Sequence, residues 1–177
     1  MIPFLLAHLI SLAWGFPPEV HVADAKKTLL YLTDGLVVGG DRAINDVVVK
    51  DIRRAPNAGF ERIVIDLEGT QSGERAAIPR PPYYQVSISA DEQRLVFTVW
   101  GHPKLGFDAP KVHTAFKKSQ MVNGLQLYPR LNEDSWTFSM GLKPGKSVEV
   151  FELSNPVRVI VDIRNDPKKV PREGASK

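Results

Sequence analysis

Two short stretches, RIVIDL from Arg62 to Leu67 and RVIVDI from Arg158 to Ile163, predict the fold of this chain. Each opens with Arg, continues through three β-branched residues, has Asp in fifth position and closes with an aliphatic residue. Because alternate side chains share a face of a strand, each stretch has one wholly apolar face and one face that reads Arg, aliphatic, Asp. The apolar faces predict two strands packed on a hydrophobic core.

The mixed faces suggest how these two strands pair. If they run antiparallel with their central aliphatic residues opposed, the Arg of each stretch lies opposite the Asp of the other. We therefore predict two cross-strand ion pairs, each worth about 0.2–1 kcal/mol, between Arg62 and Asp162 and between Arg158 and Asp66. A third Arg-led run, RLVFTV at residues 94–99, has Thr in fifth position. An internal duplication and the ordinary chemistry of buried strands therefore both remain open.

Short apolar runs separated by turn residues continue along the chain. Asp34-Gly35 stands between two such runs and predicts a β-hairpin. A strand from residue 47 to 53 is expected to end before Pro56, and residues 70–82 are expected to form a loop. The other predicted strands cover residues 61–69, 83–89, 94–101, 124–131, 135–142, 147–153 and 157–163.

One short helix is predicted near residues 108–116. Asp108 is a possible N-cap, Pro110 falls in the first turn, and Val112, Ala115 and Phe116 have helical spacing. Short, regularly spaced strands predict an all-β fold of two packed, mainly antiparallel sheets, either a sandwich or a partly open barrel. At most one or two short helices are expected.

Length and composition exclude several classes of protein. A chain of 177 residues is expected to form one domain, and we place it at residues 16–165. The absence of cysteine excludes disulfides, thiolate metal sites and a cysteine nucleophile. A net charge of +3 is far below that of nucleic-acid binders, so no nucleic-acid partner is predicted.

The first fifteen residues, MIPFLLAHLISLAWG, predict an export signal that is cleaved before Phe16. The run is shorter than the about 20 apolar residues of a membrane-spanning helix, so no stable span is expected after cleavage. A buried N-terminal element, or a start codon assigned too late, is the alternative. Residues 166–177 lack apolar periodicity and are predicted to be a disordered basic tail.

Two longer stretches resemble AMIN domains, in which a D-I-R strand leads into an R-V-V-F-D-L strand and the domain closes with V-F-x-L-x-N-P-x-R-L-V-V-D. The middle of the chain, residues 70–147, is longer than in compact AMIN domains and resembles the expanded AMIN-like variant of secreted bacterial proteins. The residues that match the family pattern are Asp51, Ile52, Arg53, Arg62, Asp66, Leu153, Asn155, Pro156, Arg158 and Asp162.

The resemblance implies two packed sheets with approximate internal symmetry in an extracytoplasmic bacterial protein. AMIN domains accompany peptidoglycan amidases and outer-membrane secretins, and localise them by binding peptidoglycan or other envelope components. For this chain it implies a periplasmic or envelope-associated module without a catalytic domain. The expected structural framework consists of Arg62, Asp66, Asn155, Pro156, Arg158 and Asp162.

Catalytic and metal signatures are not found. The four histidines have no metal-ligand spacing, and there is no Gly-x-Ser-x-Gly motif or Gly-rich phosphate loop. Asp66 and Asp162 could form a carboxylate pair for hydrolysis, but an Arg-led strand makes ion pairing the favoured role. We predict no enzyme activity, no cofactor and no metal.

Ligand binding is expected to depend on aromatic side chains that lie flat under a sugar ring, beside polar donors. The candidates are Tyr83, Tyr84, Trp100, Tyr128 and Arg130, and core packing is the alternative for each aromatic residue. The favoured function is an envelope module that binds peptidoglycan or another envelope component. A structural adaptor that binds an envelope protein, for example by strand addition, is the alternative.

Overall fold

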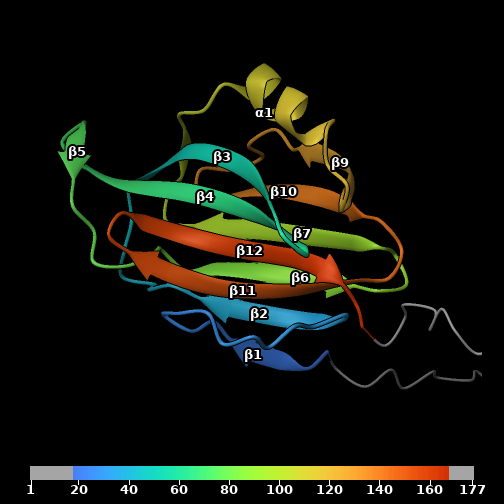
Figure 1. Ribbon diagram of the computed structural model, residues 1–177. Coiled ribbons are helices and arrows are strands. Elements are labelled where there is room, and N and C mark those ends of the chain that lie inside the picture. Colours follow the sequence, from blue (N-terminus) through green and yellow to red (C-terminus); the bar gives the residue numbers. More distant parts are fainter. Residues whose placement is uncertain (1–17, 168–177) are drawn as a thin grey trace, which may run out of the picture.

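The computed structural model describes residues 18–167, in which two sheets of six strands each pack face to face (Figure 1). The predicted all-β fold is confirmed, and it is a sandwich because neither sheet closes into a barrel. The predicted signal, residues 1–15, lies outside the described residues, as does most of the predicted tail. The described part of the chain contains no helix long and apolar enough to cross a membrane.

The first sheet has the order β1-β2-β6-β7-β10-β9. The second has the order β11-β12-β4-β3-β8, and β5 pairs with β4 beside that path. Two strand pairs, β1–β2 and β3–β8, are parallel, and the others are antiparallel. The elements are β1 (Val20–Val22), β2 (Gly35–Gly39), β3 (Val47–Asn57), β4 (Phe60–Gln71), β5 (Glu74–Ala76), β6 (Tyr84–Ser89), β7 (Arg94–Trp100), β8 (Lys104–Leu105), α1 (Ala109–Phe116), β9 (Val122–Leu127), β10 (Ser135–Leu142), β11 (Lys146–Ser154) and β12 (Val157–Asn165).

The core lies between the sheets and uses the apolar faces that the sequence predicted. From the second sheet it takes Ile63, Ile65, Leu67, Val159, Val161 and Ile163, all buried. From the first sheet it takes a row of aromatic rings, in which Phe97 stacks on Tyr84 and on Phe138. Burying such faces on both layers is the main driving force for this fold, since each sheet alone would leave one apolar face in water.

The two Arg-led strands are neighbours at the centre of the second sheet. β4 and β12 run antiparallel with Val64 opposite Ile160, as predicted. The hairpins β3–β4 and β11–β12 therefore lie side by side, related by an approximate twofold axis through that pair. This arrangement is what a duplication would produce.

One of the two predicted ion pairs forms. Arg62 donates two hydrogen bonds to Asp162, at 2.7 and 2.8 Å, which confirms the first pair. The second prediction is wrong, because Asp66 accepts two hydrogen bonds from Arg53 on β3, at 2.6 and 2.9 Å. Arg53 is a diagonal neighbour of Asp66 across the β3–β4 pair, from where its planar guanidinium meets the carboxylate in bidentate fashion. Arg158 instead donates to the Pro156 carbonyl, at 3.2 Å.

The predicted hairpin at Asp34-Gly35 is wrong. Residues 24–32 cross to the second sheet, where Leu32 and Val148 exchange two backbone hydrogen bonds of 2.8 and 2.7 Å. This segment is held there by the buried carboxylate of Glu149, which accepts a hydrogen bond from the backbone N–H of Thr28 at 2.7 Å. If residues 24–32 formed a hairpin instead, the buried Glu149 carboxylate would lose this donor. The burial of Glu149 therefore favours the crossing of this segment to the second sheet.

The sandwich has two open sides between its sheets. Residues 24–32 cross one of them, and α1, which packs against β3 and β9, covers the other (Figure 1). The helix was predicted correctly: the Asp108 side chain accepts a hydrogen bond from the Lys111 N–H at 3.0 Å, and Val112 and Phe116 are buried. Some predicted strand limits were wrong. A strand was predicted up to residue 131, but β9 ends at Leu127. β3 continues past Pro56, which is tolerated because β8 pairs only with Val48 and Val49 of β3. The predicted loop 70–82 contains β5.

We predict that Asp162→Asn lowers the free energy of unfolding by about 2–3 kcal/mol. Breaking a buried ion pair costs about 3–5 kcal/mol, and this is reduced here because the partners Arg62 and Lys27 are about one-third exposed. Urea denaturation of the purified protein measures the change. As a control, Asp66→Asn acts on a pair whose Arg53 side chain is 52% exposed, and should cost about 1 kcal/mol. Equal losses in the two variants would contradict the role of Asp162 as the buried anchor.

Candidate functional site

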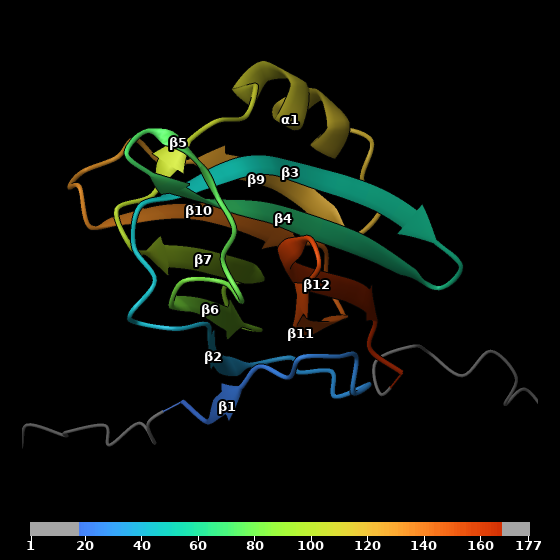
Figure 2. The ribbon, with the colours of Figure 1, turned by 90° about the vertical axis from the view of Figure 1, so that its left-hand side faces the viewer.

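Several loops meet at one end of the sandwich, which we call the loop end and define by residues 40–46, 72–83, 101–103 and 128–134. Figure 2 looks onto this end, where β4 passes into β5. Backbone hydrogen bonds connect the loops: Asp41 donates to Pro81, and Gly101 donates to Asp134. Gly101 has a φ of +92°, and a Cβ there would lie 2.6 Å from the Ile44 carbonyl oxygen. Glycine at this position therefore allows the loops to pack closely.

An aromatic pocket of about 210 Å³ lies at the loop end, on the outer side of the first sheet. The rings of Tyr83 and Trp100 are 5.2 Å apart between centroids and inclined by 44°. The guanidinium of Arg42 lies 3.8 Å from the centroid of the Tyr83 ring, which fixes that ring in place. The complete lining is Asp41, Arg42, Ile44, Asn45, Tyr83, Trp100, Gly101, His102 and Asp134.

Polar groups surround these rings. His102 lies between two carboxylates, with its Nδ1 3.8 Å from Asp46 and its Nε2 3.4 Å from Asp134. Asn45 and Asp41 line the same pocket and supply amide and carboxylate oxygens. The pocket therefore combines two aromatic rings with hydrogen-bond donors and acceptors, and it contains both acidic and basic side chains. Within residues 18–167, no group of three or more His, Asp or Glu side chains could hold a metal ion.

The outer face of the first sheet continues from this pocket as an uncharged surface. Gln85 donates to the Tyr83 hydroxyl at 2.7 Å, and the hydroxyls of Thr98 and Thr137 lie 2.9 Å apart. These side chains alternate with core residues along β6, β7 and β10. The surface next to Trp100 is thus rich in hydroxyl and amide groups.

The structure brings together some of the predicted ligand residues and separates others. Tyr83 and Trp100 share the pocket. Tyr128 lies on the same sheet face outside it, with its hydroxyl 3.2 Å from both Ser139 and Gln126. Arg130 is exposed and donates to the Pro103 carbonyl at 3.1 Å.

Tyr84 does not belong to the site, because its side chain is fully buried in the core. Burial, together with the charge of Glu152, raises the pKa of its hydroxyl well above the usual range. Since side chains alternate along a strand, only one of two consecutive tyrosines can face outward, and here it is Tyr83. Sequence reasoning missed Arg42, Asn45 and His102, which come from loops without a motif.

A second hollow, which we call the charged groove, lies at the loop end beside the second sheet and has a volume of about 650 Å³. Three framework residues predicted from the family resemblance, Asp66, Asn155 and Pro156, line it together with Asp51. The rest of the lining is Lys50, Leu67, Glu68, Arg75, Ala76, Ala77, Ile78, Ser154 and Val157. Hydrogen bonding to Asp66 raises the pKa of Arg53.

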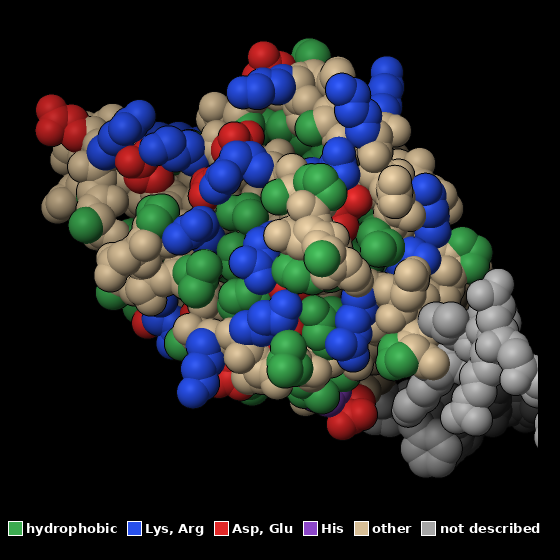
Figure 3. All heavy atoms as spheres, viewed as in Figure 1, with side chains coloured by type: hydrophobic (Ala, Val, Ile, Leu, Met, Phe, Trp, Pro, Cys, Tyr) green, Lys and Arg blue, Asp and Glu red, His purple; other side chains and the backbone are tan. Residues whose placement is uncertain are grey.

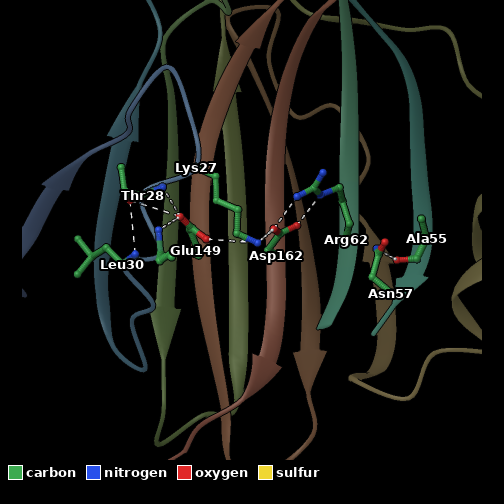
Figure 4. A network of polar contacts seen from close by, with 9 residues as sticks. Lys27, Thr28, Leu30, Ala55, Asn57, Arg62, Glu149 and Asp162 are labelled. Atoms are coloured by element: carbon green, nitrogen blue, oxygen red, sulfur yellow. Dashed lines mark hydrogen bonds and ion pairs between the residues drawn. The ribbon is translucent and has the colours of Figure 1, made fainter. Parts of the chain in front are cut away.

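Two other framework residues, Arg62 and Asp162, belong to an ion cluster on the outer face of the second sheet (Figure 4). Asp162 is fully buried and accepts hydrogen bonds from Arg62 and, at 2.8 Å, from Lys27. Burial alone would lower the pKa of Lys27, but its interactions with Asp162 and Tyr31 raise it overall. Hydrogen bonding to Asp162 also raises the pKa of Arg62. These contacts support the framework role of the two residues.

A family model for the AMIN-like domain matches residues 47–165, about two thirds of the chain. The chain belongs to the AMIN-like domain family. The matched AMIN-like region begins at the first residue of β3 and ends at the last residue of β12, so β1, β2 and the crossing segment 24–32 precede it. This family is generally associated with the cell envelope. No curated protein and no solved structure shows a significant match to the chain.

We predict that a double-mutant cycle on Arg53 and Asp66 gives a coupling energy of about 0.5–1 kcal/mol, because the pair is bidentate but half exposed. The same cycle on Arg158 and Asp66 should give a coupling energy near zero, since Arg158 bonds to a backbone carbonyl instead. Unfolding free energies from urea titration provide both values. A larger coupling for the Arg158 pair would contradict the ion pairing described here.

Proposed function

We propose that this AMIN-like protein is a non-catalytic module of the bacterial cell envelope that binds peptidoglycan through the aromatic pocket. The observation that supports this most is the Tyr83–Trp100 pair at the border of an uncharged sheet face, with Arg42 fixing one ring. Two of the aromatic residues singled out from the sequence thus lie together, next to polar side chains.

The chemistry of the pocket suits a sugar. One face of a pyranose ring is mainly C–H groups, which pack on an aromatic ring, while its edge carries hydroxyl and acetamido groups that need hydrogen-bond partners. Asn45, Asp134 and His102 offer such partners around Trp100. A volume of about 210 Å³ is below the about 300–1,000 Å³ of drug-sized ligand sites, and suits one sugar unit of a longer chain.

The surroundings of the pocket favour a polymer over a free sugar. The outer face of β6, β7 and β10 bears hydroxyl and amide groups, so neighbouring sugar units can lie along it. The net charge of +3 adds a weak, long-range attraction to an anionic wall polymer. The predicted export signal at residues 1–15 would bring the protein to that polymer outside the cytoplasm.

Binding to another envelope protein by strand addition is the second candidate. β9 favours it, because this strand ends its sheet and pairs with β10 on one side only. Tyr128 donates its N–H to the Thr137 carbonyl, so by alternation the backbone groups of Leu125 and Leu127 face away from β10. The edge of β11, in contrast, already bonds to residues 24–32.

We predict that the purified protein is retained on isolated, protein-free peptidoglycan sacculi, and that Trp100→Ala or Tyr83→Ala weakens retention about tenfold. The loss follows from removing a ring that stacks on the sugar. A pull-down with salt titration measures it, and retention through the pocket should depend weakly on salt.

Tyr31→Ala is the matched control, because Arg164 lies over the Tyr31 ring at 3.6 Å much as Arg42 lies over that of Tyr83. Tyr31→Ala should bind like the unmodified protein. Failure of the unmodified protein to bind would reject the peptidoglycan proposal and favour strand addition. Release of dye from labelled sacculi that Asp66→Ala or Asp162→Ala abolishes would overturn the non-catalytic assignment.

A further inference from the structure

We propose that the charged groove is a second binding site, which takes an anionic peptide with small aliphatic side chains. The groove and the aromatic pocket both lie at the loop end, and they are lined by residues of opposite layers of the sandwich. This inference rests on the proposed function, because peptidoglycan would be the natural source of the peptide. Its glycan chains carry short, alanine-rich peptides with free carboxylates.

The walls of the groove are held in place by tight packing. One wall is the segment 76–78 at the end of β5, which we call the arm, and the other is the turn between β11 and β12. A Cβ at Gly69 would lie 2.5 Å from Ile78 Cγ2 and 2.9 Å from the Ala76 carbonyl oxygen, so the arm rests directly on β4. A hollow of about 650 Å³ with fixed walls has the size of sites that bind small ligands.

The inner surface of the groove suits small apolar side chains. Ala76, Ala77 and Ile78 line one wall, and Pro156 and Val157 line the other. These side chains are short, which leaves room for a peptide backbone between the walls. Burial of methyl groups against them supplies attraction without selecting for large residues.

The carboxylate side chains of the groove are less exposed to solvent than the cationic side chains that pair with them. The carboxylates of the groove are Asp51, Asp66 and Glu68, which are 34%, 15% and 25% exposed. Arg53, 52% exposed, lies beside the first two. Two cations share Glu68: Lys50 at 3.7 Å, 49% exposed, and Arg75 at 3.4 Å, 75% exposed. An approaching ligand therefore meets Lys50 and Arg75 first. Figure 3 shows Lys and Arg side chains spread over the outer face of the second sheet, with Asp and Glu side chains among them.

Asn155 adds a polar contact at the opposite wall. Its side chain is exposed and makes no hydrogen bond with any described residue, so both its donor and its acceptor are available. A side-chain amide in this state can bond to both the C=O and the N–H of an extended peptide. The groove thus offers two cations for carboxylates, an amide for backbone and apolar walls for methyl groups.

The test uses a synthetic peptide, acetyl-Ala-Glu-Ala-Ala with a free carboxyl terminus, and isothermal titration calorimetry. We expect the double variant Lys50→Glu/Arg75→Glu to raise the Kd about tenfold, because two attractive contacts become repulsive. Lys117→Glu/Lys118→Glu carries the same charge change on exposed residues at the end of α1 and should leave the Kd unchanged. Acetyl-Ala-Lys-Ala-Ala amide, which is cationic, should bind more weakly than the anionic peptide.

Two further experiments distinguish a failure of this inference from a failure of the proposed function. Trp100→Ala should lose binding to peptide-free glycan chains but keep the anionic peptide, and Lys50→Glu/Arg75→Glu should do the reverse. Gly69→Ala moves the arm without changing any charge and should also weaken peptide binding. The inference is overturned if the unmodified protein does not bind the anionic peptide, or if the groove double variant binds it equally well.

Discussion

The arrangement of this molecule depends on the buried carboxylate of Asp162. It lies on the outward face of β12, where a charged group would normally be in water, yet it is fully buried. A buried carboxylate is tolerated only when it is paired and hydrogen bonded. Arg62 satisfies this need from β4 and Lys27 from the crossing segment 24–32, so one group ties together the register of the second sheet and the path of the N-terminal chain.

The same layering of charge recurs along the outer face of the second sheet. Carboxylates such as Glu149 and Asp66 lie inward and are largely buried, whereas the Lys and Arg side chains that pair with them lie outward. The ion pairs hold the strands and their neighbouring segments, and the outer halves of the cations remain exposed to solvent. Family motif residues that hold these strands therefore also line the charged groove, which we propose as a binding site.

The first sheet uses its outer face differently. Hydroxyl and amide side chains replace ion pairs there, and aromatic rings gather only at the loop end, around Trp100. Two chemically distinct sites, one built on aromatic rings and one on ion pairs, thus lie at one end of the sandwich. A heteropolymer of sugar and peptide offers a matching pair of surfaces, which links the two proposed sites to one ligand.

The sequence by itself determined the sheets, the helix and the register of β4 against β12, because alternation, turn chemistry and the opposed Arg and Asp are local or pairwise features. It predicted the pairing of Arg62 correctly and that of Arg158 incorrectly, since a competing partner, Arg53, approaches Asp66 only once β3 has folded beside it. Likewise, only the tertiary structure decided the crossing of residues 24–32 and the grouping of Arg42, Asn45 and His102 with Trp100. These depend on loops from distant parts of the chain, whose meeting is settled by packing and by the satisfaction of buried charge.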